Sequence, residues 1–308
     1  LISAERPKDN ENKTIIQLHN SAPAGNSIGL RTRSKNNDGL ARAMLMKKIT
    51  IKDIKSLKKG NKKFTVLTAY DFSFARVLND TKIDIILVGD SLGNVIQGNK
   101  NTIPVTMEEM CYHTKLVAKA ASHSLVMSDM PFMSYKTLDD ALTNATKLMQ
   151  SGAEIIKIEG GRWVEKIIKE LSVRGIPTCC HLGLTPQYIH KLGSYGVRGK
   201  GQDEANTIKS DSMILEKAGA DFLLLECVPT LLGEEITKAL EVPVIGIGAG
   251  GQTDGQVLVT HDILGLSELT PKFTKNFLTD ANSIKEAIEL YKEAVLSGKF
   301  PSSENCFE

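Results

Sequence analysis

The sequence predicts a (β/α)8 barrel, and three repeated features carry that prediction. Eight short apolar runs, bounded by turn residues, have the pattern of strands that are buried on both faces. Most of these runs end in a charged or hydrogen-bonding residue, and amphipathic helical patterns lie between several of them. In this fold the carboxyl ends of the strands build the active site at one rim. The expected strands cover residues 64–71, 84–91, 124–131, 153–160, 176–183, 220–227, 242–250 and 256–264.

The length and composition fit one such barrel and argue against several classes of partner. A chain of 308 residues accommodates a barrel of about 250 residues with extensions. The net charge of +2 is too small to indicate a nucleic-acid or membrane partner. No apolar run approaches the roughly 18 residues that a membrane span needs. The five cysteines form no CxxC pair, which favours reduced thiols in a reducing compartment.

The first 46 residues differ from the rest of the chain. They are rich in Asn, Ser, Lys and Arg, they contain no Phe, Tyr or Trp, and they lack a sustained apolar period. We therefore expect a disordered or non-native N-terminal extension over residues 1–46 and a single catalytic barrel domain over residues 47–308. A transit peptide is the alternative, and four acidic residues count against it, namely Glu5, Asp9, Glu11 and Asp38.

The first half of the chain alternates strand and helix patterns. Residues 49–63 form a basic helical pattern that we expect to close the floor of the barrel, and a helix follows the first strand. A long loop follows the second strand, and loops of this length are often functional. Thr106 and Glu109 form a capping box that starts a helix. A further helix is expected from Thr137 to Gly152.

The second half continues the pattern with two glycine-rich segments. Residues 193–201 hold four glycines and are expected to form a mobile, lid-like loop. Residues 246–251 match GxGxxG, but no long helix follows them, so a glycine-lined rim is favoured over a dinucleotide site. The short connection to the eighth strand leaves room for a single helical turn at most. Ser283 and Glu286 predict a capping box at the start of the last helix.

Three acids stand at expected strand ends, Asp90, Asp129 and Glu159. This is a set of oxygen ligands without a His or Cys pair, so it suits a hard cation, Mg2+ rather than Zn2+. Magnesium is usually held by one or two carboxylates, with substrate and water completing its shell. Any one of these acids alone could equally cap a helix, so the set is what predicts a metal.

Two further charged residues interrupt apolar strands. Lys157 and Glu159 are two positions apart and face the same way, which indicates a structural ion pair or a site. Glu226 ends an apolar strand at the same rim. Together with a metal, these groups predict carbanion chemistry beside the carbonyl of a 2-oxo acid. Lys157 would stabilise the developing enolate, and Glu226 would remove or relay a proton.

The sequence is similar to the ketopantoate hydroxymethyltransferase (3-methyl-2-oxobutanoate hydroxymethyltransferase) family. The matching stretches run in order from residue 64 to residue 300, which is nearly the whole expected barrel. VGDSLG, KIEGG and HLGLTPQ are highly specific together, whereas VGDS alone also resembles strand ends of the phosphoenolpyruvate mutase and isocitrate lyase group. The other stretches are LTAYDFSFA, TIPVTMEEMCYHT, SDMPFMSY, LLLECVP, PVIGIGAGGQTDGQ, HDILG and PKFTKNF.

The resemblance implies a reaction and its setting. A hydroxymethyl group would pass from 5,10-methylenetetrahydrofolate to 3-methyl-2-oxobutanoate, giving 2-dehydropantoate on the route to pantothenate and coenzyme A. The resemblance also implies a barrel like that of the phosphoenolpyruvate mutase group. It further implies a cytoplasmic homo-oligomer, often a decamer.

The resemblance also implies roles for individual residues. Glu226 would be the proton acceptor, and His181 would have a supporting role. Mg2+ would be bound by three acids, Asp90, Asp129 and Glu159, the last through water. The oxo acid would be contacted by four residues, Asp90, Ser91, Asp129 and Lys157.

Two other functions stay open on the sequence. One is a Mg2+-dependent lyase or aldolase that acts on another 2-oxo acid, which an assay with methylenetetrahydrofolate would discriminate. The other is a non-catalytic barrel that serves as a binding protein, and the presence of Lys157 and Glu226 counts against it.

Overall fold

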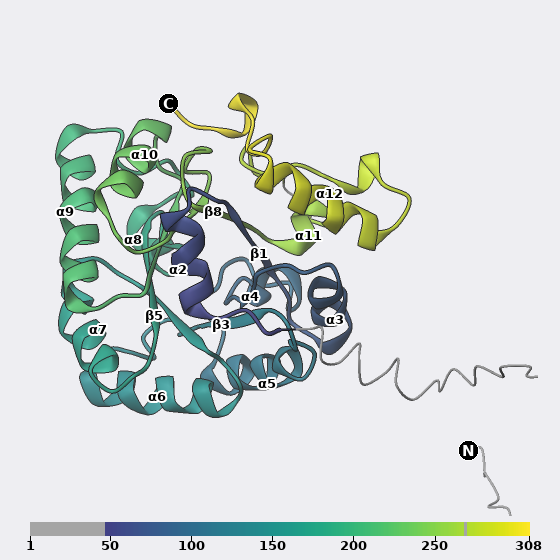
Figure 1. Ribbon diagram of the computed structural model, residues 1–308. Coiled ribbons are helices and arrows are strands. Elements are labelled where there is room, and N and C mark those ends of the chain that lie inside the picture. The colour runs from purple at the N-terminus through teal and green to yellow at the C-terminus, as the bar shows by residue number, and fades with distance from the viewer. Residues whose placement is uncertain (1–46, 268–269) are drawn as a thin grey trace, which may run out of the picture. The chain divides into compact units, whose positions relative to one another are not determined.

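The computed structural model describes residues 47–267 and 270–308 (Figure 1). The expectation of an N-terminal extension over residues 1–46 lies outside the described residues. The expected single barrel domain over residues 47–308 is described apart from residues 268–269.

Eight parallel strands pair in chain order and close into a barrel, which confirms the predicted fold. Each strand is buried along nearly its whole length, as near-continuous apolar runs require. The strands are β1 (Phe64–Thr68), β2 (Ile85–Val88), β3 (Leu125–Asp129), β4 (Ile155–Glu159), β5 (Thr178–Gly183), β6 (Phe222–Glu226), β7 (Val244–Ile247) and β8 (Gly255–Leu258).

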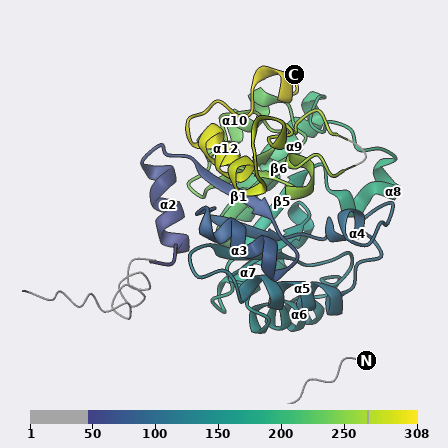
Figure 2. The same ribbon diagram turned by 90° about the vertical axis from the view of Figure 1, so that its right-hand side faces the viewer.

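The helices form an outer layer around the strands (Figures 1 and 2). Ten follow the barrel strands or connect to them, from α3 (Phe72–Asp80) to α12 (Ile284–Leu296), within the described ranges. Those between are α4 (Leu92–Val95), α5 (Met107–Ala118), α6 (Leu138–Gln150), α7 (Glu165–Ser172), α8 (Ile189–Leu192), α9 (Gln202–Ala218), α10 (Thr230–Ala239) and α11 (Thr260–Ile263). Four 3-10 turns complete them, η1 (Arg162–Val164), η2 (Pro186–Tyr188), η3 (Leu278–Asp280) and η4 (Ser303–Asn305).

The helix starts follow the predicted caps with one exception. Thr106 and Glu109 make the full capping box, and the Thr137 hydroxyl accepts from the Asp140 amide. Ser283 accepts from the Glu286 amide, but the Glu286 side chain bonds the Asn282 amide instead of that of Ser283. Only half of the expected box therefore forms at α12, because the carboxylate reaches one residue further back.

A preceding helix, α2 (Ile51–Lys59), closes one end of the barrel as predicted. Its Ile54 is fully buried, and its lysines bind acids at the amino ends of strands. Lys55 Nζ lies 2.7 Å from Asp221, just before β6, and Lys58 Nζ lies 2.8 Å from Asp254, just before β8. The opposite, carboxyl end of the barrel stays open for a site.

The observed strands are shorter than predicted, because the rim residues leave the sheet to form turns. Asp71 caps α3 by accepting from the amides of Ser73 and Phe74. His261 and Asp262, placed in the eighth strand by the sequence, lie instead in α11. The long loop after β2 also starts with a single helical turn, α4, rather than with irregular chain.

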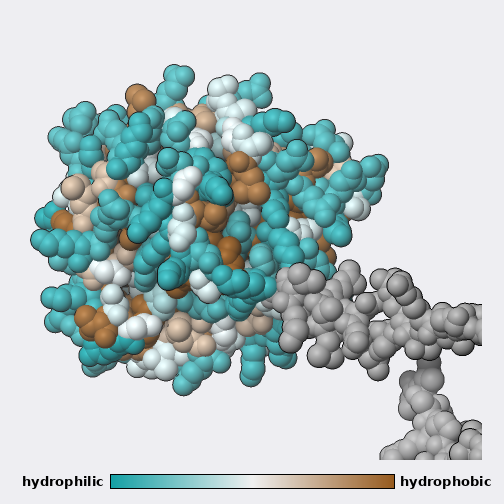
Figure 3. All heavy atoms as spheres, viewed as in Figure 1, coloured by the Kyte–Doolittle hydropathy of each residue, from teal (hydrophilic) through white to brown (hydrophobic). Residues whose placement is uncertain are grey.

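The visible face of the molecule is mostly hydrophilic, with small and separate apolar patches (Figure 3). Within the described parts of the chain, no helix combines the length and the apolar character needed to cross a membrane. Residues 193–201 contain neither helix nor strand, as expected for a loop, and their mobility stays a prediction.

Candidate active site

The register of the barrel brings the predicted site residues together. Asp129 at the end of β3 pairs with Lys157 on β4, and Glu159 pairs with His181 on β5. Partners in register on parallel strands point to the same face of the sheet. Glu226 follows on β6, opposite Gly183. Four neighbouring strands therefore present five charged or titratable side chains to the inside of one rim.

These side chains form a continuous series of ion pairs. Lys157 Nζ lies 2.7 Å from Asp129 Oδ1 and 3.9 Å from Glu159 Oε1. Glu159 Oε1 lies 3.2 Å from His181 Nδ1, and His181 Nε2 lies 3.3 Å from Glu226 Oε2. The first four residues are almost completely buried, whereas the Glu226 side chain keeps 15% of its exposure. Glu226 is therefore the member of the series with the most access to the cavity.

The end of β2 joins this series through its backbone. The Asp90 amide donates to Asp129 Oδ2 at 3.0 Å, and the hydroxyls of Ser91 and Tyr70 lie 2.8 Å apart. A Cβ at Gly89 would lie 2.8 Å from Ser91 Oγ and 3.5 Å from Asp129 Oδ2, so a larger residue there would displace the Ser91 hydroxyl. The VGDS turn thus sets Asp90 and Ser91 directly against Asp129.

Electrostatics separate the acids of the site. Burial raises the pKa of Asp90 well above its usual range, and the charges of Asp129 and Glu159 raise it further. Burial also acts to raise the pKa of Glu159, but His181 and Lys157 outweigh it, so that this pKa is lowered. Asp90 therefore lacks sufficient compensation for its charge, whereas Glu159 has it.

The two basic groups of the site hold their protons strongly. Burial acts to lower the pKa of Lys157, but the charges of Asp129 and Glu159 outweigh it and the pKa is raised. Burial and the charge of Lys157 act to lower the pKa of His181, but Glu159 and Glu226 raise it to about 9. His181 is thus a cation at neutral pH that lies between two carboxylates.

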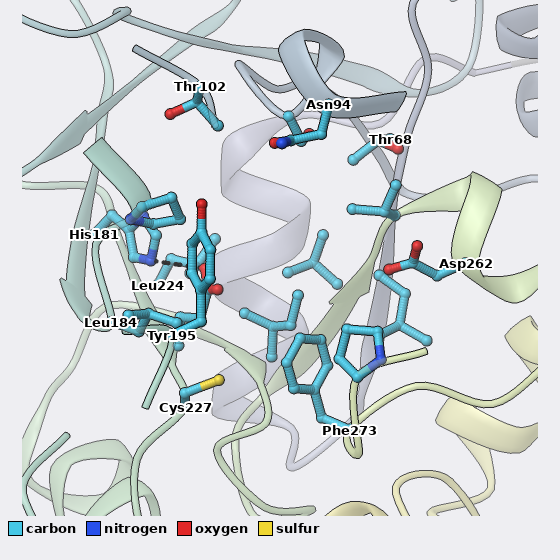
Figure 4. A pocket seen from close by; sticks show the side chains of 18 of the residues that line it. Thr68, Asn94, Thr102, His181, Leu184, Tyr195, Leu224, Cys227, Asp262 and Phe273 are labelled. Atoms are coloured by element: carbon cyan, nitrogen blue, oxygen red, sulfur yellow. Dashed lines mark ion pairs between the residues drawn. The ribbon is translucent and has the colours of Figure 1, made fainter. Parts of the chain in front are cut away.

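All seven predicted residues line one cavity of about 650 Å3. Ligand pockets commonly measure about 300–1,000 Å3, so the cavity is large enough for two small substrates or one long one. Figure 4 shows His181 and Tyr195 on one side of this cavity and Asp262 on the other, with Phe273 along its edge. The predicted site residues lining it are Asp90, Ser91, Asp129, Lys157, Glu159, His181 and Glu226.

The acidic end of the cavity fits a hard cation in part. Asp129 Oδ1 is buried and lies 2.7 Å from Lys157 Nζ, its one partner among the described residues. Asp90 Oδ1 has no hydrogen bond within the described residues. Across those residues, however, no group of three or more His, Cys, Asp or Glu side chains is placed to hold a metal alone. The geometry suits a cation held by two carboxylates and completed by substrate and water.

The sequence analysis missed Gln187, which organises this end of the cavity. Its side-chain amide donates to Asp90 Oδ2 at 2.8 Å and to the Met130 carbonyl at 3.0 Å, and its carbonyl accepts from Tyr135 at 2.7 Å. Its backbone amide donates to Glu159 Oε2 at 3.1 Å. The only signal in the sequence was its place in HLGLTPQ.

The comparisons with known proteins agree with this geometry. Residues 48–303 match the sequence pattern of the ketopantoate hydroxymethyltransferase family. The chain belongs to this family. It is therefore an enzyme, a transferase that passes a hydroxymethyl group to 3-methyl-2-oxobutanoate, and the predicted family and activity are confirmed. The family name also carries its route, pantothenate biosynthesis.

Two relatives show how far the similarity extends. The 3-methyl-2-oxobutanoate hydroxymethyltransferase of Marinomonas sp. (strain MWYL1) is 52% identical over 265 residues, which cover 86% of this chain and 96% of that protein. The enzyme of the same name from Photorhabdus laumondii subsp. laumondii is 51% identical over 262 residues, covering 85% of this chain and all of that protein.

Solved structures share the fold at low identity. Phosphoenolpyruvate phosphomutase from Streptomyces platensis subsp. rosaceus has a TM-score of 0.54 at 13% identity, over 70% of this chain and 83% of that one. A 2,3-dimethylmalate lyase of the same superfamily has a TM-score of 0.51 at 12% identity, over 68% and 80% of the two chains. These likenesses agree with the barrel fold that the strands of this chain form.

Gln187→Leu should lower the free energy of unfolding by about 1–3 kcal/mol, because Asp90 and Tyr135 lose a buried partner. Gln187→Glu should behave differently, since it places a second carboxylate beside Asp90. Two carboxylates this close together raise the pKa of one of them in the folded protein. The free energy of unfolding of this variant therefore falls as the pH rises from about 4, where unfolded carboxyls titrate, towards neutrality.

Urea denaturation at pH 5 and pH 8 measures both effects. The difference between Gln187→Glu and the wild type should grow strongly at pH 8. That between Gln187→Leu and the wild type should grow less, because leucine removes only the hydrogen bond that lowers the pKa of Asp90. A pH-independent loss for Gln187→Glu would mean that residue 187 does not contact Asp90.

Proposed function

We propose that this family member enolises 3-methyl-2-oxobutanoate with the charged series at the rim and transfers to it a hydroxymethyl group from 5,10-methylenetetrahydrofolate. The observation that carries the proposal is the Glu159–His181–Glu226 series beside the Asp129–Lys157 pair in one cavity. In this arrangement Lys157 lies next to Asp129, one of the acids that would hold a metal. The more exposed carboxylate of Glu226 lies at the other end of the series. Enolisation needs both groups on the same substrate.

The oxo acid is bound at the β2 to β4 end of the rim. Lys157 keeps its positive charge at any physiological pH, and it therefore offers a fixed cation to the carboxylate or carbonyl oxygen of the substrate. Ser91, held by Tyr70, offers a hydroxyl donor from the neighbouring strand. These contacts place the carbon next to the carbonyl towards β6. The proposed contacts with the oxo acid come from Asp90, Ser91, Asp129 and Lys157.

Asp90 and Asp129 would hold Mg2+ directly, and Glu159 would complete the site through water. Both oxygens of Glu159 already have partners, His181 and the Gln187 amide, which is why we give it the indirect role. When bound, the ion would polarise the substrate carbonyl as a Lewis acid. A cation there also compensates the charge of Asp90, whose pKa is raised by burial and by its acidic neighbours.

Glu226 accepts the proton from C3 of the oxo acid. Its carboxylate is the most exposed of the series, and His181 lies 3.3 Å behind it. Because His181 is held protonated between two carboxylates, it presents a positive charge beside the Glu226 carboxylate. The resulting enolate carbon then bonds the one-carbon unit of the folate, and the two C–N bonds of that unit break. Water supplies the hydroxyl group of the product, and tetrahydrofolate leaves with the proton taken from C3 and one proton of the water.

The setting of the enzyme is also proposed from the family resemblance. We assign Mg2+ as the metal, methylenetetrahydrofolate as the second substrate, a homo-oligomer that is a decamer as the assembly, and the cytoplasm as the compartment. Phosphonopyruvate hydrolase, which shares the fold at 13% identity with a TM-score of 0.53 over 68% of this chain and 81% of that one, was solved with oxalate and Mg2+. That likeness concerns the fold, so the choice of metal rests on the chemistry of the carboxylates.

Turnover of 3-methyl-2-oxobutanoate with methylenetetrahydrofolate tests the reaction, and Asp129→Asn tests the metal. The purified wild type should form 2-dehydropantoate, lose activity with a chelator and regain it with Mg2+. Asp129→Asn should lose more than about 100-fold in activity, because it removes a charged ligand, and calorimetry should show weakened Mg2+ binding. Full activity of Asp129→Asn with undiminished Mg2+ affinity would remove Asp129 from the metal site. Turnover of another 2-oxo acid without folate would favour a lyase instead.

Glu226→Gln should slow the reaction by about 100- to 10,000-fold, the usual contribution of a general base. Glutamine keeps the size of the side chain but cannot accept the proton. The measurement is exchange of the C3 hydrogen of 3-methyl-2-oxobutanoate in deuterated water, followed by NMR without folate. Calorimetry should show that the variant still binds the oxo acid.

Glu235→Gln is the matched control, because Glu235 is exposed and pairs with Lys209 on the outside of the barrel. Exchange at the wild-type rate in Glu226→Gln would mean that another group removes the proton. Loss of exchange together with loss of oxo-acid binding would mean that Glu226 shapes the site and does not transfer the proton.

A further inference from the structure

We propose that the wall of the cavity formed by Asp262, Phe273 and Phe307 binds the pterin ring of the folate substrate. The inference deepens the proposed function and rests on it, because it assigns a subsite to the second substrate. The three residues come from α11, from the segment that follows it, and from the carboxyl-terminal end of the chain.

The cavity has far more room than the oxo acid needs. The charged residues of β2 to β6 lie at one part of its wall, and a five-carbon oxo acid held there fills a small share of about 650 Å3. Much of the remaining wall comes from β7, β8 and the segments that follow them, and the rest from β1, from the α4 region and from the segments after β5 and β6. Figure 4 shows Asp262 pointing into the cavity from the side opposite His181. A second, longer ligand therefore has a wall of its own, facing the reacting groups.

Among the described residues that line this second wall, Asp262 carries the one acidic side chain. It is partly buried, and Ser267 donates to its Oδ1 at 2.5 Å. No ion pair or further side-chain hydrogen bond to this carboxylate is found among the described residues. Burial raises the pKa of Asp262, against the opposing effect of the Ser267 hydrogen bond. The carboxylate thus lies in the cavity with acceptor capacity to spare and lacks a cation to compensate it.

Two aromatic rings lie on the same wall as this carboxylate. The rings of Phe273 and Phe307 meet edge to face at 6.5 Å, and both line the cavity. The end of the chain is fixed in place, since the Thr230 amide donates to the Phe307 carbonyl at 2.9 Å. Lys272 also donates to the Cys306 carbonyl at 2.6 Å and lies 5.3 Å from the centre of the Phe307 ring. Phe307 is therefore held as part of the wall.

The chemistry of this wall matches a reduced pterin. The pyrimidine edge of the pterin presents a ring N–H and an exocyclic amino group side by side, as two parallel donors. A carboxylate with free lone pairs accepts both donors together. The flat ring system then packs against aromatic side chains, which bury its faces. The oxo acid itself has no such pair of donors, so the wall suits the second substrate and not the first.

Phe307 lies beyond the part of the chain that the family description matches, which ends at residue 303. The family match therefore says nothing about its contribution to the wall, which comes from the structure. Asp262 lies inside the matched part, four residues after the end of β8. The wall thus combines Asp262, which lies at the rim of the barrel, with Phe307 from the C-terminal segment.

The experiment measures binding of tetrahydrofolate, and of its 2-desamino analogue, to the full chain with the oxo acid and Mg2+ present. Asp262→Asn should weaken tetrahydrofolate binding by about 10- to 100-fold, because it removes a charged acceptor from two donors. The desamino analogue should bind the wild type about tenfold more weakly than tetrahydrofolate does. It should bind Asp262→Asn with little further loss. Asp139→Asn, an exposed acid in the first turn of α6, is the matched control.

Phe307→Ala should also weaken tetrahydrofolate binding while the affinity for the oxo acid is retained. The proposal is overturned if the wild type binds tetrahydrofolate and the desamino analogue equally, which needs no variant to fold. It is also overturned if Asp262→Asn binds tetrahydrofolate like the wild type, or loses oxo-acid affinity to the same extent. If the wild type neither binds tetrahydrofolate nor turns over methylenetetrahydrofolate, the proposed function itself fails. Wild-type turnover with an unaffected Asp262→Asn rejects the subsite alone.

Discussion

The buried pair of Lys157 and Asp129 is the interaction on which the rest of the site depends. Three carboxylates meet inside the rim of an apolar barrel, where an uncompensated charge is very costly. Lys157 lies between these carboxylates, and its ammonium is within 4 Å of both Asp129 and Glu159. Without that cation the acids could not all stay ionised, and the barrel could not tolerate them. A structural requirement and a chemical function therefore meet in one side chain.

The other features of the site follow from this pair. The charges of His181 and Lys157 outweigh the effect of burial on Glu159 and lower its pKa. Burial raises the pKa of Asp90, which follows β2, two strands away from Lys157 on β4, and the charges of Asp129 and Glu159 raise it further. At one part of the rim the charge of Glu159 is balanced by side chains of the protein. At the other part the charge of Asp90 is not, and that part can accept an external cation. Gln187 links the two parts, since it bonds both Asp90 and Glu159. The cavity beyond them leaves a separate wall for a second substrate.

Much of this arrangement could be predicted from the sequence, because strand ends in a parallel barrel all meet at one rim. The spacing of Lys157 and Glu159 was enough to predict that they face the same way. The role of Gln187 could not be predicted, since it depends on a turn after β5 that folds back against the ends of β2 and β3. Phe307 was missed for a similar reason, because its neighbours lie dozens of residues away in the sequence. The predicted end of the eighth strand, residue 264, was wrong, because residues 260–263 form a helical turn and do not continue the sheet.

A double-mutant cycle on Lys157 and Asp129 tests the central claim most directly. Lys157→Met alone should lower the free energy of unfolding by about 3–5 kcal/mol, since it leaves buried carboxylates without a cation. Adding Asp129→Asn should cost much less in that background than in the wild type, or even restore stability. We predict a coupling energy of about 2 kcal/mol or more, measured by urea denaturation at pH 8. Effects that add within about 0.5 kcal/mol would contradict the account, because the two side chains would then act independently.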